Sequence, residues 1–258
     1  MMKWPERLDF MRHGVSAYNA LVKEKKNGPA YRAFIEAWEH EPHSDETRRL
    51  AILAKNEIFL GIGDWSTPLQ PEHVDDAIRT GVGLRHSDTP VPHIIFASPY
   101  RRTLDTLEAV REGWPEIRDV PVVKDERLRE RENGIKLLYP DRQIFDALFP
   151  DQAQLRKLEG DYWYRPPQGE NIPDVRMRTH AWVSTLIREF AGKRVFSVVH
   201  HVLILSARAT LERWDAEKYI DMDEHHKPSN CGVTRYRGNP ALGSDGKLEL
   251  EFYNRIFH

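Results

Sequence analysis

Two arginines and two histidines follow apolar segments that read as strands. Arg12 and His13 directly follow one such segment, Arg102 comes shortly after a second, and His200 directly follows a third. In open α/β sheets, ligands bind beyond the carboxyl ends of the strands, so these four side chains are expected at one rim. Guanidinium groups grip phosphate oxygens, one imidazole can attack phosphorus, and the other can donate to the charge that develops. The pattern therefore predicts a site for a tetrahedral dianion.

The elements that must hold these side chains alternate along the chain. Four short apolar segments predict buried strands: Leu8–Met11, His93–Ala97, Val120–Val123 and Val195–Val199. A helix is predicted over Tyr100–Glu112, with Ser98 as its cap. A longer helix is predicted after residues 169–171, where one apolar stripe ends before Gly192: Val175, Trp182, Leu186 and Phe190. Alternation of this kind favours an α/β fold, a three-layer α/β/α sandwich with a mostly parallel central sheet.

Two segments interrupt the alternation. Residues 21–63 carry an amphipathic helical face that includes Tyr31 and Trp38 but no following strand, and residues 131–168 are rich in aromatic and charged side chains. We expect one domain, residues 1–258, with these segments as helical insertions. They are expected either to form a cap that selects the substrate or to be surface elaboration without a ligand role, since long insertions cost little free energy.

Composition excludes several functional classes. The 258 residues include 38 basic and 40 acidic side chains, a net charge of −2, so the basic excess of a nucleic-acid binder is missing. The longest apolar stretches are far shorter than the roughly 20 residues that cross a bilayer, so no membrane span is expected. The single cysteine, Cys231, excludes an intrachain disulfide, and the first residues lack an apolar signal core. A cytoplasmic location is expected.

Taken in order, the motifs resemble the histidine phosphatase superfamily, in the branch that contains phosphoglycerate mutases and broad-specificity phosphatases. The signature Arg-His-Gly-x-Thr-x-x-Asn matches residues 12–19, with Ser16 in place of threonine, and Ser-x-x-x-Arg-x-x-x-Thr matches residues 98–106. Residues 64–69 resemble the family's Asp-x-x-Leu region, and residues 127–130 the stretch with the acidic proton donor. The Gly-Glu-Asn at residues 169–171 is similar to the Gly-Glu-Ser that opens the family's long helix. The resemblance covers about residues 8–236.

The resemblance implies a role for each matching residue. His13 corresponds to the nucleophile that carries a transient phosphoryl group, and Glu130 to the acid that protonates the leaving oxygen and then deprotonates water. The phosphate clamp and its further donors correspond to Arg12, Arg102, His200, Asn19 and Ser16. Glu126 and Glu132 are alternatives to Glu130, because charged residues crowd the segment 124–133.

One position departs from the family pattern. His201 stands where the family has a glycine directly after its second histidine. Either the turn is reshaped or an additional imidazole contacts the substrate, and a shift of register would make His201 the catalytic group instead of His200. The pairs His225–His226 and His40–His43 are not interpreted as metal ligands, because Pro42 interrupts the second pair and no cysteine lies near.

The residues after Glu130 favour hydrolysis over transfer. Family mutases continue as Glu-Arg-x-Tyr-Gly, whereas residues 130–134 read Glu-Arg-Glu-Asn-Gly and lack the tyrosine. Residues 165–170 resemble the broad-specificity phosphatases. The resemblance implies a metal-independent phosphatase that hydrolyses small phosphomonoesters through phosphohistidine, without a cofactor. There are two alternatives. One is a phosphoglycerate mutase; the other is a phosphate-binding module with little turnover, which the presence of His201 would permit.

Overall fold

The computed structural model describes residues 3–87 and 89–258 and divides into two compact units. Unit 1 comprises Met1–Ser16, Trp65–Glu130 and Asp174–His258, and unit 2 comprises Ala17–Asp64 and Arg131–Pro173. Unit 2 thus contains both predicted insertions, 21–63 and 131–168, with a few more residues at their ends. That unit 2 caps a single domain stays a prediction.

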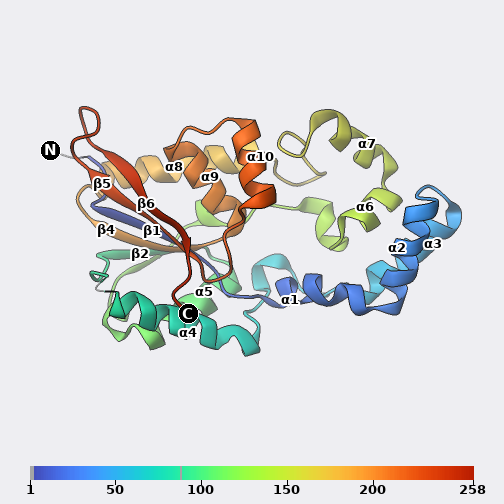
Figure 1. Cartoon of the computed structure of the whole chain (residues 1–258), viewed down its shortest axis with the longest axis horizontal. Coiled ribbons are helices and arrows are strands. Elements are labelled where there is room, and N and C mark those ends of the chain that lie inside the picture. Colours follow the sequence, from blue (N-terminus) through green and yellow to red (C-terminus); the bar gives the residue numbers. More distant parts are fainter. Residues whose placement is uncertain (1–2, 88) are drawn as a thin grey trace. The chain divides into compact units, whose positions relative to one another are not determined.

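Unit 1 is built on a mixed sheet (Figure 1). Within the described residues the sheet has six strands in the order β3-β2-β4-β1-β5-β6: β1 (Arg7–Arg12), β2 (Ile94–Ala97), β3 (Val122–Lys124), β4 (Arg194–Val199), β5 (Val233–Asn239) and β6 (Lys247–Arg255). The strands β1 to β4 are parallel, β5 pairs antiparallel with β1, and β6 pairs antiparallel with β5. The mostly parallel sheet is confirmed. The third strand begins two residues later than predicted, and β5 and β6 were not predicted.

Helices cover both faces of this sheet, which confirms the three-layer α/β/α arrangement (Figure 1). One face packs against α4 and α5, and the other against α8 and α9. The bounds of the unit 1 helices are α4 (Val74–His86), α5 (Arg101–Gly113), α8 (Ile172–Glu189, beginning in unit 2), α9 (His201–Leu211) and α10 (Ala216–His225). Because successive strand side chains alternate, Phe10 of β1 points to the α8 face and Met11 to the α4 face.

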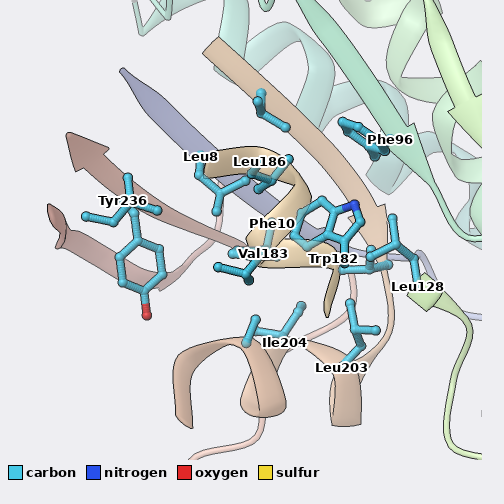
Figure 2. Packing of buried hydrophobic residues seen from close by; sticks show 14 residues of the cluster. Leu8, Phe10, Phe96, Leu128, Trp182, Val183, Leu186, Leu203, Ile204 and Tyr236 are labelled. Atoms are coloured by element: carbon cyan, nitrogen blue, oxygen red, sulfur yellow. The ribbon is translucent and has the colours of Figure 1, made fainter. Parts of the chain in front are cut away.

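The apolar stripe of α8 fills the centre of the core (Figure 2). The Trp182 ring lies 5.9 Å from that of Phe10 and 5.5 Å from that of Phe96, between centroids. Val175 and Leu186 are also fully buried, and Phe190 packs against the same cluster. The predicted stripe is therefore confirmed, because a helix residue every third or fourth position faces the sheet.

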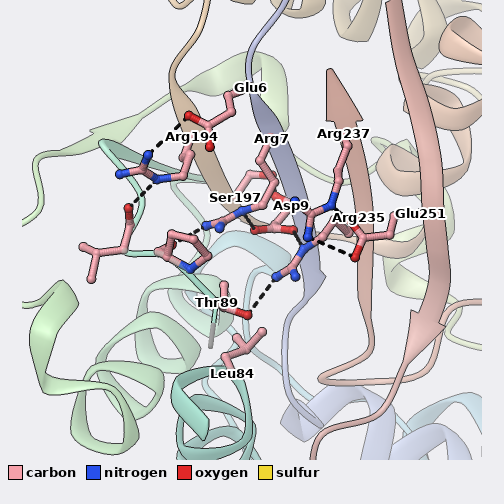
Figure 3. Close-up of polar contacts among 12 residues, drawn as sticks. Glu6, Arg7, Asp9, Leu84, Thr89, Arg194, Ser197, Arg235, Arg237 and Glu251 are labelled. Carbon is pink, nitrogen blue, oxygen red and sulfur yellow. Dashed lines mark hydrogen bonds and ion pairs between the residues drawn. The ribbon is translucent and has the colours of Figure 1, made fainter. Parts of the chain in front are cut away.

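A buried ion network joins β1 to β5 at the end of the strands remote from His13 (Figure 3). The Asp9 carboxylate accepts from Arg7 Nε at 2.7 Å and from Arg235 Nε at 2.6 Å, and all three side chains are buried. Asp9 and Arg235 are direct cross-strand partners. A buried carboxylate needs such partners, so the pair helps to fix the register of β5 beside β1.

The prediction that Ser98 caps α5 is wrong. The helix begins at Arg101 with Tyr100 as its N-cap, and no side chain caps it. Ser98 lies two residues too early, directly after β2, and its hydroxyl is 2.7 Å from His200 Nε2. The Ser98 hydroxyl therefore contacts His200 at the end of β2 and does not cap α5.

Unit 2 is helical over its described residues, which confirms the helical reading of both segments. Its helices are α1 (Ala17–Glu24), α2 (Pro29–His40), α3 (Asp45–Glu57), α6 (Arg142–Leu148) and α7 (Pro150–Glu159). Tyr31 and Phe34 of α2 pack with Ala54 of α3 and Ile144 of α6 in a core of their own. None of the helices in the described part of the chain has the length and apolar character that a membrane span requires.

Candidate active site

The four side chains that the strand pattern placed at one rim lie together in unit 1. Arg12 ends β1, His13 follows it, Arg102 stands in the first turn of α5, and His200 follows β4. The His13 amide donates to Val199 O at 2.9 Å, so β1 and β4 end side by side. The rings of His13 and His200 are 5.1 Å apart between centroids, and Arg102 Nε lies 3.3 Å from His13 Nε2.

Two contacts define the tautomer of His13. Its Nδ1 is 2.7 Å from Gly14 O, and a carbonyl oxygen only accepts, so Nδ1 carries the proton. Its Nε2 accepts from the Nε–H of Arg102, which only donates. The ring is therefore neutral with an unprotonated Nε2, the form in which an imidazole nitrogen acts as a nucleophile.

The surroundings of His13 keep it neutral. The side chain is 4% exposed. Burial lowers the pKa of His13 well below its usual range, and the neighbouring positive charges of Arg102 and Arg12 lower it further. Both effects disfavour the imidazolium, because a buried charge loses hydration and like charges repel.

Arg102 and Arg12 are held by different contacts. Arg102 is 5% exposed and lies over the Tyr100 ring, with its Cζ 4.9 Å from the ring centroid. Arg12 Nη1 donates to Pro228 O at 2.7 Å. Burial lowers the pKa of Arg12, and the negative charge of Glu130 offsets part of this shift. Two guanidinium groups beside one imidazole form a strongly positive site that suits a dianion.

His200 packs against His13 through its ring. It is fully buried, its Nε2 lies 2.7 Å from Ser98 Oγ, and its ring also contacts Tyr100 at 5.1 Å between centroids. Its Nδ1 has no hydrogen-bond partner among the described residues. Burial lowers the pKa of His200 well below its usual range, with Arg102 adding to the effect.

His201 occupies a different environment from His200. It is the first residue of α9, and its Nε2 lies 2.6 Å from Asp223 Oδ1 of α10. The turn from β4 into α9 is thus formed with His200 as the N-cap and without a glycine. Of the two histidines, His200 is the one whose ring contacts His13. Contact between His201 and substrate stays a prediction.

Glu130 lies at the N-terminus of α9. Its Oε2 is 3.5 Å from the amide of Val202, and its backbone carbonyl accepts from Arg178 Nη2 at 3.0 Å. Of the two alternatives, Glu126 is exposed in a short 3-10 helix, and Glu132 belongs to unit 2. The approach of Glu130 Oε2 to the Val202 amide, two residues after His200, supports Glu130, and its role as the proton donor stays a prediction.

The remaining predicted donors, Ser16 and Asn19, belong to different units. Ser16 is buried and forms an isolated antiparallel bridge with Leu69. Asn19 lies in α1 of unit 2. Roles for Ser16 and Asn19 in phosphate binding stay predictions.

Sequence reasoning missed two side chains that support the site. Arg178 of α8 donates to the carbonyl oxygens of Arg127, Arg129 and Glu130, and Asp223 of α10 pairs with His201. Both look like surface charges on amphipathic helices. Only the position of Arg178, three residues after buried Val175, indicated that it lies on an inward face.

Comparison with known proteins gives one family. The sequence profile of the histidine phosphatase superfamily (branch 1) matches residues 62–243. A relative named "Probable phosphoglycerate mutase GpmB" from Yersinia pestis (strain Pestoides F) is 24% identical over 197 residues, which are 72% of this chain and 86% of the relative.

Solved structures share the fold. The mycobacterial glucosyl-3-phosphoglycerate phosphatase in complex with inorganic phosphate has a TM-score of 0.64 at 20% identity, covering 98% of each chain. The alpha-ribazole phosphatase from Shigella flexneri has a TM-score of 0.66 at 16% identity, covering 97% of this chain and 96% of its own.

Proposed function

The chain belongs to branch 1 of the histidine phosphatase superfamily, and from this we propose that it is a phosphatase that hydrolyses small phosphomonoesters through a phosphohistidine on His13, without a metal ion. One observation carries the proposal: His13 is held with its proton on Nδ1 and with an unprotonated Nε2 that accepts from Arg102 Nε. When the Arg102 guanidinium turns to bind phosphate, the lone pair of Nε2 is released to attack phosphorus.

In the first step, His13 Nε2 attacks phosphorus in line with the ester oxygen. The new N–P bond forms as the P–O bond to the leaving group breaks, and protonated Glu130 gives its proton to the leaving oxygen. Arg12 and Arg102 neutralise the charge on the equatorial oxygens, and His200 adds a donor. The bound dianion also favours the positive charge that His13 acquires, which the arginines alone oppose.

In the second step, water attacks the phosphohistidine. Glu130, now a carboxylate, takes the proton of the water while the new P–O bond forms and the N–P bond breaks. The lone pair returns to Nε2, so His13 regains its starting tautomer and inorganic phosphate leaves. The charges that this cycle needs come from side chains, which is the basis for proposing metal independence.

Transfer between phosphoglycerates is the second candidate. The relative with the mutase name supports it, whereas the phosphatase names of two similar structures support hydrolysis. The replacement of the family glycine by His201 opened a third candidate, binding without turnover. Because His200 still packs against His13 beside that replacement, the geometry supports a working site over that third candidate.

The test is turnover of p-nitrophenyl phosphate in EDTA, with and without 2,3-bisphosphoglycerate. Steady release of nitrophenol, with acid-labile phosphate trapped on the wild type and absent from His13→Ala, is expected. Slow release that the bisphosphate stimulates would favour the mutase. No release and no trapped phosphate, although phosphate binds, would overturn the enzyme proposal.

A further inference from the structure

The loop between α10 and β5 braces the turn that carries His13. Arg12 and this loop exchange two backbone hydrogen bonds, from Cys231 N to Arg12 O at 3.1 Å and from Arg12 N to Gly232 O at 3.1 Å. The Arg12 side chain also donates to Pro228 O. Several residues of the loop therefore bind the end of β1, although more than 200 residues separate the two segments in the sequence.

One side chain of the loop reaches past Arg12 to the nucleophile itself. Asn230 Nδ2 donates to His13 O at 2.9 Å and to Gly14 O at 3.0 Å. Since both partners are carbonyl oxygens, the amide nitrogen must be the atom that faces them. Gly14 O is the same oxygen that accepts the Nδ1 proton of His13. Asn230 therefore contacts the acceptor that sets the tautomer of the nucleophile.

The Asn230 contact compensates for the conformational freedom of Gly14. A Cβ at this position would approach Leu69 Cδ1 to 2.7 Å, so the packing leaves little room for a side chain. Glycine, however, leaves the backbone torsions soft, and the direction of its carbonyl must be set from outside. The peptide between His13 and Gly14 is held at its amide by Thr106 Oγ1 at 3.0 Å and at its carbonyl by Asn230. The next carbonyl, that of Gly14, is held by Asn230.

The loop is itself firmly anchored. Cys231 adopts a left-handed conformation with φ 59°, which is uncommon for a non-glycine residue and persists where the surroundings enforce it. Asn254 of β6 accepts from the Ser229 amide at 2.8 Å and lies where a Cβ on Gly232 would stand. The Asn230 amide is thus presented from a fixed backbone, which suits a positioning function.

We propose that Asn230 is a positioning residue that keeps His13 in its Nδ1-protonated tautomer by fixing the Gly14 carbonyl; this rests on the proposed function, in which Nε2 attacks. Without Asn230 the Gly14 carbonyl can turn away, and the proton can move to Nε2. A protonated Nε2 has no lone pair for phosphorus and cannot accept from Arg102. The bond between His13 and phosphorus then forms more slowly, while the arginines still bind phosphate.

The experiment uses Asn230→Ala in the full chain, with Asn230→Leu as a second variant that keeps a similar volume, removes the donor and adds no charge. The control, Ser229→Ala, removes only a hydroxyl that lies 3.3 Å from Asn254 Nδ2 and leaves the catalytic turn untouched. Two readouts are measured: the ¹⁵N imidazole shifts of His13, which report its tautomer, and kcat with KM for p-nitrophenyl phosphate.

Wild type and Ser229→Ala are expected to show the Nδ1–H tautomer of His13. Both Asn230 variants are expected to populate the Nε2–H form and to lose kcat by about 10–100-fold with KM changed less than about threefold, since a misplaced reacting group costs rates of this order. Unchanged His13 shifts in a folded Asn230 variant would overturn the proposal, whether or not kcat falls. If the wild type has no turnover, the proposed function fails, yet the tautomer readout still decides the positioning role.

Discussion

Among single residues, Arg12 and Arg102 affect the charge of His13 differently in the free protein and in the proposed phosphate complex. Arg12 and Arg102 lower the pKa of His13 in the free protein, together with burial, and so keep its nitrogen available. In the proposed reaction, a phosphate dianion bound beside the two guanidinium groups would neutralise their charge, so the imidazolium that forms on attack would no longer be opposed. The proposed substrate would then supply the negative charge that this positive site lacks.

Glu130→Gln tests the proton donor. An amide cannot protonate a leaving alkoxide, so turnover of an alkyl phosphate is expected to fall by about 10²–10⁴-fold, as loss of a general acid does. Nitrophenolate leaves without a proton, so the first step with p-nitrophenyl phosphate is expected to be far less affected. The measurement is the single-turnover rate of phosphoenzyme formation for both substrates.

Glu126→Gln is the matched control for that prediction. Glu126 is exposed four residues earlier and was the other candidate within unit 1. It is expected to leave both rates unchanged. Selective loss of the alkyl phosphate reaction in Glu126→Gln, with Glu130→Gln unaffected, would transfer the role to Glu126.

At the scale of the element, α8 positions the segment that carries Glu130. The Arg178 guanidinium donates to the carbonyls of Arg127 and Arg129 at 2.7 Å and of Glu130 at 3.0 Å. Arg178→Met keeps most of the side-chain stem but removes all three bonds. We expect about tenfold or greater loss of alkyl phosphate turnover, with the leaving-group dependence of Glu130→Gln, because the acid is no longer held in place. Equal losses on aryl and alkyl substrates would contradict this positioning role.

The helices α4 and α5 approach closely through glycine. A Cβ on Gly113 would lie 2.0 Å from Ile78 O and 2.8 Å from Val82 N, both backbone atoms of α4. Gly113→Ala is therefore expected to push the helices apart and to lower the free energy of unfolding by about 1–3 kcal/mol, the usual cost of overpacking. Denaturant unfolding measures this loss. Glu112→Ala, an exposed change in the same turn, is the control and is expected to change stability little.

At the scale of the whole molecule, the buried histidines make stability depend on pH. Burial lowers the pKa of both His13 and His200 well below the ordinary value of about 6.5. Below about pH 6.5 the unfolded chain therefore binds more protons than the folded chain. The contribution of these histidines to the free energy of unfolding is fully present above that pH and is lost as the pH falls. Each histidine is expected to lower the free energy of unfolding by about 1 kcal/mol per pH unit between pH 6 and 5.

Denaturant unfolding at pH 7, 6 and 5 measures this dependence. His13→Asn removes one of the two groups, so its slope between pH 6 and 5 is expected to be smaller than that of the wild type. A slope that is the same in both proteins would show that His13 is protonated in the folded state.

The parts of the fold that could be predicted are those with an uninterrupted apolar signal. Residues 8–11 and 195–199 lie in the centre of the sheet and are buried on both faces, so they read as strands directly. By contrast, β6 alternates charged with apolar residues over Lys247–Phe252, which is the pattern of a strand with one exposed face, and a search for continuous apolar segments passes over it. The sequence pattern does not say which strand it pairs with, and the fold places it antiparallel to β5.

The order of the motifs along the chain was enough to predict His13 as the nucleophile and Arg12 and Arg102 as phosphate ligands, because residue types and spacing are visible without a fold. The orientation of these groups became visible in the folded chain alone. Asn230 and Arg178 act through backbone carbonyls, which every residue possesses, so their partners leave no signature in the sequence. The side-chain types of a site can be recognised in the sequence. The orientation of those side chains depends on contacts between backbone segments that are distant in the sequence.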